Sequence, residues 1–199
     1  WSPRVLAIVW LGLAALGLVV RRKIEDRPWS ALLLNAAPGI ALLGWAALSD
    51  ASLPLRLIPA AVNVMLAVIF LQTLSDERSI IEVGARLIEP KLPDFTRAYC
   101  RKSTVLWAAF FLVSAAVIAW LAVAASMSAW VGFTTQTYFL AMAVLGVGEF
   151  LVRKIYFRHY EDNVVDRAFA SLFPAEATAR GRRSAAYIAE QRAPEAASD

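Results

Sequence analysis

Five long apolar stretches constrain the fold of this chain more than any other feature of its sequence. They lie at about 5–20, 30–48, 53–71, 104–125 and 129–152. A helix needs about 20 residues to cross the roughly 30 Å of hydrocarbon in a bilayer. Hydrophobic residues make up 59% of the 199 residues and charged residues 18%, whereas soluble domains average about 25% charged. The sequence therefore predicts an all-α membrane protein with five transmembrane helices.

The placement of lysine and arginine predicts which way the chain crosses the membrane. Eighteen of the 20 basic residues lie between the first two stretches, between the third and fourth, or after the fifth. Only Arg4 and Arg56 fall on the opposite side. Because cytoplasmic loops collect lysine and arginine, we predict an amino terminus outside the cell and a carboxyl terminus in the cytoplasm.

The predicted cytoplasmic side holds most of the polar residues. We divide the chain into a membrane domain at 1–157 and a cytoplasmic tail at 158–199. The cytoplasmic loop 75–103 begins with a predicted amphipathic helix. Its apolar face carries Ile80, Ile81, Val83, Leu87 and Ile88, and its charged face Arg78, Glu82, Arg86 and Glu89. Such a helix either lies among lipid headgroups with its apolar face towards the acyl chains, or packs against its own bundle.

The tail repeats this pattern before it becomes rich in alanine, arginine and glutamate. Apolar residues recur at helical spacing before Pro174 at Val164, Val165, Ala168, Phe169, Leu172 and Phe173. They predict a second amphipathic helix, and we expect the last ten residues to be disordered. The basic run Arg180-Gly181-Arg182-Arg183 is typical of anionic lipid contact or of a solvated tail, and we favour the solvated tail.

Four polar side chains lie within the apolar stretches, where polar groups are costly and often functional. They are Asn35, Asn63, Gln136 and Glu149. Glu149 is either a proton, cation or headgroup site, or the partner of Arg153 four residues later, and we favour the pair. An asparagine near a proline can hydrogen-bond backbone carbonyls of its own helix or bond across helices, and we favour these structural roles for Asn35 and Asn63. The alternative is a polar lining for a substrate path.

The sequence lacks a recognisable set of catalytic residues. His159 is the single histidine and Cys100 the single cysteine, so the chain offers no His-based metal site or catalytic triad. Arg101 and Lys102 beside Cys100 favour a lowered thiol pKa, but no second catalytic group accompanies the thiol. We expect no cofactor and no metal, lean towards a non-catalytic protein, and leave activity open. Topology accounts for the basic residues, so nucleic acid is not an expected partner.

Several weak motifs between residues 53 and 157 together carry a resemblance to a known family. They are Pro59 and Asn63, the run 86–93, the run 99–104 with Trp107 and Phe110-Phe111, and the run 148–154. In order and spacing they resemble the uncharacterised multi-pass membrane proteins of bacterial aryl-polyene and related fatty-acid-type biosynthetic clusters. A weaker similarity, in five-span hydropathy and the Phe-Phe pair, is to the intracellular septation protein A family.

The first resemblance implies a protein of the bacterial inner membrane that works beside enzymes of acyl-chain biosynthesis or export. The implied partners are membrane lipids and other membrane subunits, with a second copy of the chain as a further possibility. Acyl carrier protein or a transporter of the resistance-nodulation type is implied on the same grounds. The second resemblance implies a role in envelope organisation.

Three hypotheses for function follow. In the first, the chain is a non-catalytic accessory subunit of a lipid or polyene assembly. Its cytoplasmic face would then bind a partner or an acidic headgroup through Arg86, Glu89, Arg97, Tyr99, Arg101 and Arg153. In the second, it is a small transporter or flippase whose four intramembrane polar residues converge on one wet cavity. In the third, it is an envelope-organising or acyl-transfer membrane protein.

Overall fold

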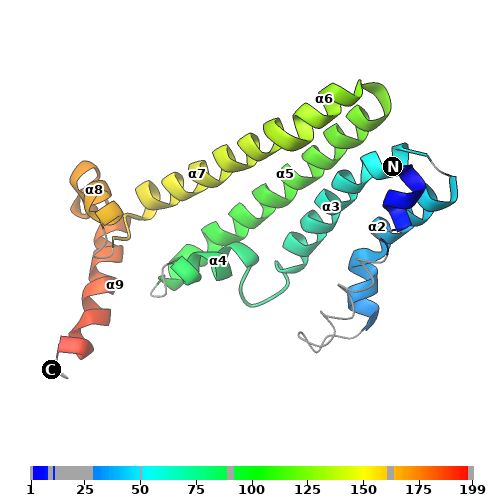
Figure 1. Cartoon of the computed structure of the whole chain (residues 1–199). Coiled ribbons are helices and arrows are strands. Elements are labelled where there is room, and N and C mark those ends of the chain that lie inside the picture. The colour runs from blue at the N-terminus through cyan, green and yellow to red at the C-terminus, as the bar shows by residue number, and fades with distance from the viewer. Residues whose placement is uncertain are drawn as a thin grey trace. The chain divides into compact units, whose positions relative to one another are not determined.

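The computed structural model describes residues 2–8, 11, 29–49, 51–88, 92–160 and 164–196. Every regular element within these ranges is helical (Figure 1), as the composition predicted. The α-helices are α2 (Trp29–Ser49), α3 (Leu53–Gln72), α4 (Ile80–Ile88), α5 (Arg97–Ala124), α6 (Met127–Gly132), α7 (Tyr138–Phe157), α8 (Val164–Leu172) and α9 (Ala179–Ala196). Short helical turns at Asp94–Thr96, Phe133–Thr137 and Ala175–Ala177 connect some of them.

Two helical segments of the described chain are long and apolar enough to cross a membrane. They are α3 and the continuous run Asp94–Ala124, which consists of a 3-10 turn and α5. These segments coincide with the third and fourth predicted spans, although α5 starts at Arg97 and not near Thr104. The predicted fifth span is helical but interrupted by a π-turn at Phe133–Thr137. Most of the predicted first span falls outside the described residues.

The chain divides into two compact units. Unit 1 contains Trp1–Gln72 and Leu106–Phe139, and unit 2 contains Thr73–Val105 and Leu140–Asp199. Because the division falls within α5 and close to the start of α7, α5 contributes a segment to each unit and α7 lies almost wholly in unit 2.

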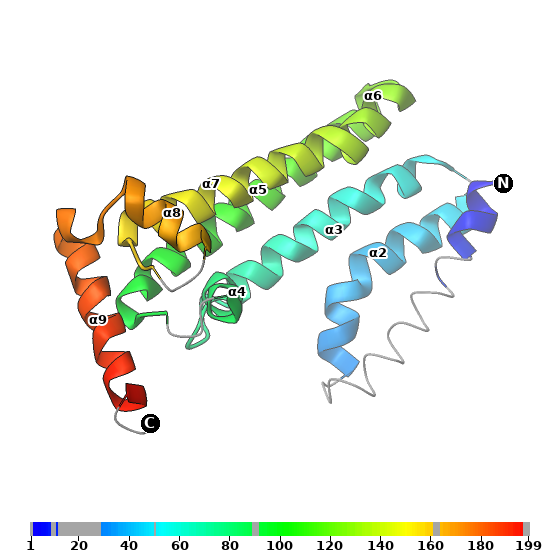
Figure 2. The same cartoon turned by 60° about the vertical axis from the view of Figure 1, so that its left-hand side comes forward.

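Apolar contacts between helices hold unit 1 together. Helices α2 and α3 lie side by side in both views (Figures 1 and 2). Ala7, Leu43 and Ala46 form one buried cluster, and Ala60 of α3 meets Ala115 and Ile118 of α5 in another. Small residues such as these alanines let membrane helices approach closely. Aromatic rings pack near them, at Phe70, Trp107, Phe110, Phe111 and Tyr138.

Two arginines of unit 1 bind the carboxyl ends of helices. Arg4 Nε donates to the carbonyl oxygen of Ala47 at 2.9 Å, in the last turn of α2. Arg56 Nη2 donates to the carbonyl oxygens of Leu121 and Ala125 at 3.1 and 3.3 Å, at the end of α5. The last carbonyls of a helix lack partners within it and carry partial negative charge, so both contacts are favourable. These are the two basic residues outside the three Lys- and Arg-rich segments.

Buried charges, by contrast, connect the helices of unit 2. Glu82 of α4 is fully buried and lies 3.1 Å from Arg86 and 3.6 Å from Arg97 of α5. Lys154 of α7 lies 2.7 Å from Asp166 of α8, and both side chains are buried. An apolar cluster of Ala85, Leu92 and Cys100 fills the space beside α4.

Candidate anion-binding site

Aromatic side chains bring α5 and α7 together within unit 2. The rings of Tyr99 and Tyr156 stack with their centroids 6.2 Å apart and an interplanar angle of 22°. Phe157 meets Tyr99 edge-on at 5.4 Å and contacts Phe95 at 6.0 Å. Offset and edge-on pairs are the favoured geometries for aromatic rings. The result is an aromatic wall formed by α5 and the end of α7.

The chain after α7 turns back on itself and is tied by hydrogen bonds. Arg158 ends α7 in the left-handed conformation, with φ of 49°. Its Nη1 donates to the carbonyl oxygen of Pro174 at 2.6 Å, and the hydroxyl of Tyr160 donates to the carbonyl oxygen of Phe173 at 2.9 Å. Burial raises the pKa of Tyr160, so its hydroxyl remains a donor at neutral pH. These bonds set where α9 begins.

Helix α9 is anchored directly to the end of α7. The hydroxyl of Ser184 is buried and donates to the carbonyl oxygen of Phe157 at 2.8 Å. A Cβ atom added at Gly181 would lie 2.1 Å from the carbonyl oxygen of Ala175. Only glycine therefore allows this close approach. The backbone N–H of Gly181 also donates to Thr178 Oγ1 at 3.0 Å, which caps the first turn.

This anchoring places two guanidinium groups over the aromatic wall. Arg180 and Arg183 are one turn apart on α9 and so share a face. The Cζ atom of Arg180 lies 3.9 Å from the ring centroid of Tyr156, and that of Arg183 lies 4.7 Å from the ring centroid of Phe95. Such cation–π contacts orient an arginine while its N–H donors stay available.

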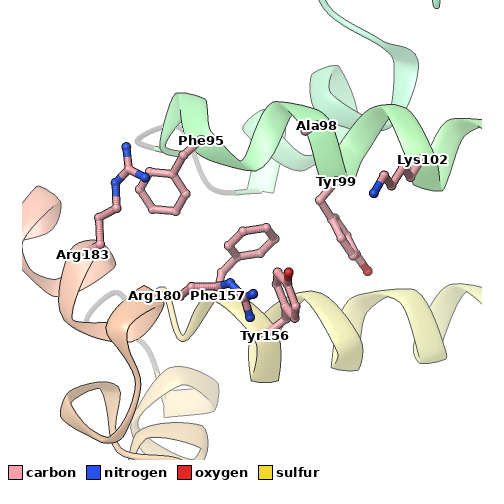
Figure 3. A pocket seen from close by; sticks show the side chains of 8 residues that line it. All are labelled: Phe95, Ala98, Tyr99, Lys102, Tyr156, Phe157, Arg180 and Arg183. Atoms are coloured by element: carbon pink, nitrogen blue, oxygen red, sulfur yellow. The ribbon is translucent and has the colours of Figure 1, made fainter.

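The aromatic wall and the two arginines line a partly open cavity of about 240 Å³, which we call the α5–α7–α9 pocket. Figure 3 shows the arginine side chains extending from α9 towards the rings. Its lining residues are Phe95, Ala98, Tyr99, Lys102, Tyr156, Phe157, Arg180 and Arg183. Three of them are cationic, and none is acidic. Planar guanidinium groups bind phosphate and carboxylate oxygens in a bidentate manner, so the pocket suits an anionic group with an apolar neighbour.

The sequence-based prediction of a cytoplasmic binding face named six residues, of which Tyr99 lines this pocket. Arg86 and Arg97 belong to the buried network around Glu82. Burial pulls the pKa of Arg86 down, but hydrogen bonds to Glu82 and Asp94 outweigh it and leave that pKa raised. The arginine therefore stays charged.

Two others of the six are also engaged within unit 2. Arg101 donates to the carbonyl oxygen of Leu74, and the buried Arg153 lies 3.6 Å from Glu149. Glu89 falls outside the described residues. The arginines of the predicted binding face thus make contacts within unit 2. The arginines that line the pocket, Arg180 and Arg183, belong to the tail.

Three of the four polar residues that we predicted to lie within the membrane are described with their side chains, and each has its own surroundings. Glu149 accepts from Ser103 Oγ at 3.4 Å and pairs with Arg153 at 3.6 Å, which is the pairing that the sequence favoured. Asn63 is buried, and its Nδ2 donates to the carbonyl oxygen of Pro59 in its own helix at 2.9 Å. Gln136 is exposed, and it belongs to the π-turn of unit 1. Asn35 lies in α2, but its side chain is outside what the structure describes.

An apolar cavity in unit 1 offers no chemistry comparable to the α5–α7–α9 pocket. It has a volume of about 360 Å³ and is lined by Leu6, Leu43, Leu55, Ile58 and Pro59. Among the described residues, no group of three or more His, Cys, Asp and Glu side chains is placed to hold a metal ion. Burying a polar group in such an apolar cavity without a hydrogen-bond partner costs free energy, so the cavity suits an apolar occupant.

Sequence reasoning missed Arg180 and Arg183 because it favoured a solvated tail. The available signal was their spacing of three residues, with Gly181 between them and Ser184 after them. That spacing puts both cations on one helical face, but a helix alone does not say what this face meets. The contact with α7 depends on the hydrogen bonds from Arg158 to Pro174 and from Tyr160 to Phe173, which no local pattern encodes.

Comparison with known proteins adds no relative to this picture. No protein-family model, no curated protein and no solved structure matches the chain. The function is therefore argued from the site itself.

Proposed function

We propose that this chain is a five-span protein of the bacterial inner membrane that binds an anionic lipid headgroup at its cytoplasmic face. The proposal makes it a non-catalytic accessory subunit of a lipid or polyene assembly or export system. One observation carries it: three cations and no carboxylate surround a cavity whose other walls are aromatic rings. All three cations are exposed, and cations gathered around a cavity that no carboxylate lines favour an anionic ligand.

The position of the pocket along α5 and α7 supports a lipid as the source of the anion. Val152 and Ile155 on α7 are exposed apolar residues immediately before Tyr156. Val105 and Leu106 on α5 are exposed three to four residues after Lys102. One helical turn rises about 5.4 Å, so apolar surface suited to acyl chains begins within about a turn of the pocket. A headgroup in the pocket would place its acyl chains against this surface.

The proposed orientation is supported by what the two exceptional arginines do. Arg4 and Arg56 each donate to the last carbonyls of a helix. These structural contacts are consistent with the proposed placement of Arg4 and Arg56 on the side opposite the other eighteen basic residues. The positive-inside distribution then favours a cytoplasmic location for the end of unit 2 that contains the pocket.

The resemblance of residues 53–157 to proteins of aryl-polyene clusters suggests the setting. Acyl-chain assembly involves amphiphiles with acidic headgroups and also acidic carrier proteins. The positive charge of the pocket suits either of them. We favour the lipid because of the neighbouring apolar surface. The transporter hypothesis gains no specific support, since Asn63 contacts its own helix and Gln136 is exposed.

A binding experiment with matched arginine variants tests the proposal. The full chain would be reconstituted in phosphatidylcholine nanodiscs with a small fraction of phosphatidic acid, and native mass spectrometry would count the retained lipids. Arg180→Gln and Arg183→Gln each remove one cation from the pocket. Arg182→Gln removes the same charge from the same helix, but Arg182 instead donates to the carbonyl oxygen of Glu176 at 2.7 Å.

We expect the two pocket variants to weaken phosphatidic acid binding about tenfold, because a charge-assisted hydrogen bond contributes about 1.5–3 kcal/mol. The Arg182→Gln variant should retain it. Equal losses in all three variants would show only diffuse attraction and would contradict a specific site. Displacement of the lipid by water-soluble glycerol phosphate at similar concentration would show that a soluble anion is the ligand.

A further inference from the structure

In the short helix α4, the side that packs against the rest of unit 2 carries a charged residue. Glu82 is 0% exposed and pairs with Arg86 and Arg97, while Ser79 and Ala85 are also buried. Val83 and Leu87, one turn apart, are 48% and 81% exposed. In a helix that packs on a water-soluble core the apolar face is the buried one. In α4 the buried side carries the charged Glu82 beside Ala85, while Val83 and Leu87 are left exposed.

Helix α8 shows the same arrangement, independently and in another part of unit 2. Asp166 is 1% exposed and pairs with the buried Lys154 of α7 at 2.7 Å. Phe169 contacts Phe150 of α7, with ring centroids 6.4 Å apart. The other apolar residues, Val164, Val165 and Leu172, are exposed. Two separate ion-pair networks thus hold polar faces inward and leave apolar side chains outside.

Both helices are attached at one level of the α5–α7 pair. Helix α4 packs on α5 at Cys100, next to Tyr99. Helix α8 packs on α7 at Lys154, two residues before Tyr156. Because Tyr99 stacks on Tyr156, these two attachment points lie at a common height along the two helices. On α7, Val152 and Ile155 are exposed apolar residues beside this level.

We propose that α4 and α8 are interfacial helices whose exposed apolar residues insert into the lipid bilayer around the cytoplasmic ends of α5 and α7. The occupant of these faces is lipid, because α4 packs on α5, which belongs to a segment long and apolar enough to cross a membrane, and α8 packs on α7 beside the exposed apolar residues Val152 and Ile155. An interfacial helix buries its apolar side at the boundary between headgroups and acyl chains. The internal ion pairs satisfy the charges that would otherwise face this apolar layer. The inference rests on the proposed membrane topology, but not on the anion-binding pocket.

Spin-label accessibility in vesicles tests this placement on the full chain. A Cys100→Ser background would carry single labels at Leu87→Cys and Leu172→Cys. Arg167→Cys provides a matched control, since Arg167 is an exposed residue of α8 at the edge of its apolar stripe. Vesicles would contain phosphatidylcholine and phosphatidylglycerol. Collision with oxygen, which concentrates in lipid, would be compared with collision with a water-soluble nickel chelate.

We expect the oxygen-to-nickel ratio at Leu87 and Leu172 to exceed that at Arg167 several-fold. Free access of nickel to all three labels would overturn the inference. Exclusion of both reagents at Leu87 or Leu172 would also overturn it, because a protein surface would then cover the helix. A label at Val113→Cys on α5, an exposed apolar position, separates the two proposals. Nickel access at Val113 would contradict the membrane topology itself, whereas a lipid signal at Val113 alone would contradict only the interfacial helices.

Discussion

The two units are held together by different physical means. In unit 1 the contacts between helices are made by alanines, leucines and aromatic rings, and the buried Asn63 bonds to its own helix. In unit 2 charged pairs connect α4 to α5 and α7 to α8. Among the described residues, the buried charged side chains all belong to unit 2. In unit 1 the tertiary polar contacts run from arginines to the last carbonyls of helices, whereas in unit 2 they run between buried or half-buried charged side chains.

This difference follows from the surroundings that we propose for each unit. Helices within hydrocarbon gain little from burying apolar groups and associate through close packing of small residues. A unit at the water interface can bury charges when each is paired, and each pair then fixes one helix against another. In this proposal unit 2 holds the pocket in place, and unit 1 contributes most of the membrane anchor. The predictions below test that contrast in order of expected effect.

The largest effect is expected from breaking a pair that holds unit 2. Asp166→Leu leaves the buried ammonium of Lys154 without its carboxylate and should destabilise unit 2 by about 3–5 kcal/mol. The double variant Lys154→Met/Asp166→Leu removes both charges and should be much less destabilised. Thermal unfolding in detergent and the rate of proteolysis of α8 measure the effect. Equal stability of the single and double variants would contradict a stabilising role for the pair.

A smaller but more specific effect is expected at the start of α9. Gly181→Ala puts a Cβ atom against the backbone of Ala175, and overpacking of this kind costs about 1–3 kcal/mol. The shift of α9 should also weaken phosphatidic acid binding. Gly84→Ala is the control, because a Cβ atom there meets nothing within 4 Å. It should leave binding unchanged, and a similar loss in both variants would refute the proposed close contact.

In unit 1 the expected effect of removing a charge is modest. Arg56→Gln removes a cation from the carboxyl end of α5 and should cost about 1 kcal/mol. The midpoint of thermal unfolding, followed by helical circular dichroism, measures the cost. Arg78→Gln, at an exposed position of unit 2, is the comparison. A larger loss from Arg78→Gln than from Arg56→Gln would run against the role given to Arg56.

The smallest effect is expected at the π-turn of unit 1. The hydroxyls of Thr134 and Thr135 donate to backbone carbonyls of the preceding turn, and Gln136 is exposed. Gln136→Leu should therefore change the free energy of unfolding by less than about 0.5 kcal/mol. It should also leave lipid binding unchanged. A strong loss of binding or stability would revive the polar-path interpretation of this residue.

Sequence reasoning predicted the helical class and the two helical segments that are long and apolar enough to cross a membrane, because hydrophobic periodicity and length are local properties. It also anticipated the Glu149–Arg153 pair, since a spacing of four residues fixes that contact within one helix. It left the direction of α4 open, because an amphipathic pattern does not say which face is buried. It missed Arg180 and Arg183 as pocket residues, since their environment depends on how α9 packs against α7. The buried face of α4 and the surroundings of Arg180 and Arg183 depend on packing between helices, which local sequence patterns do not specify.

The most direct test of the account is native mass spectrometry of the protein gently extracted from its own membrane. The account predicts a chain that retains one anionic lipid, which the Arg180→Gln/Arg183→Gln double variant loses and the Arg182→Gln variant keeps. If the wild-type chain carries no such lipid, or if the double variant carries the same lipid as the wild type, the α5–α7–α9 pocket is not a headgroup site.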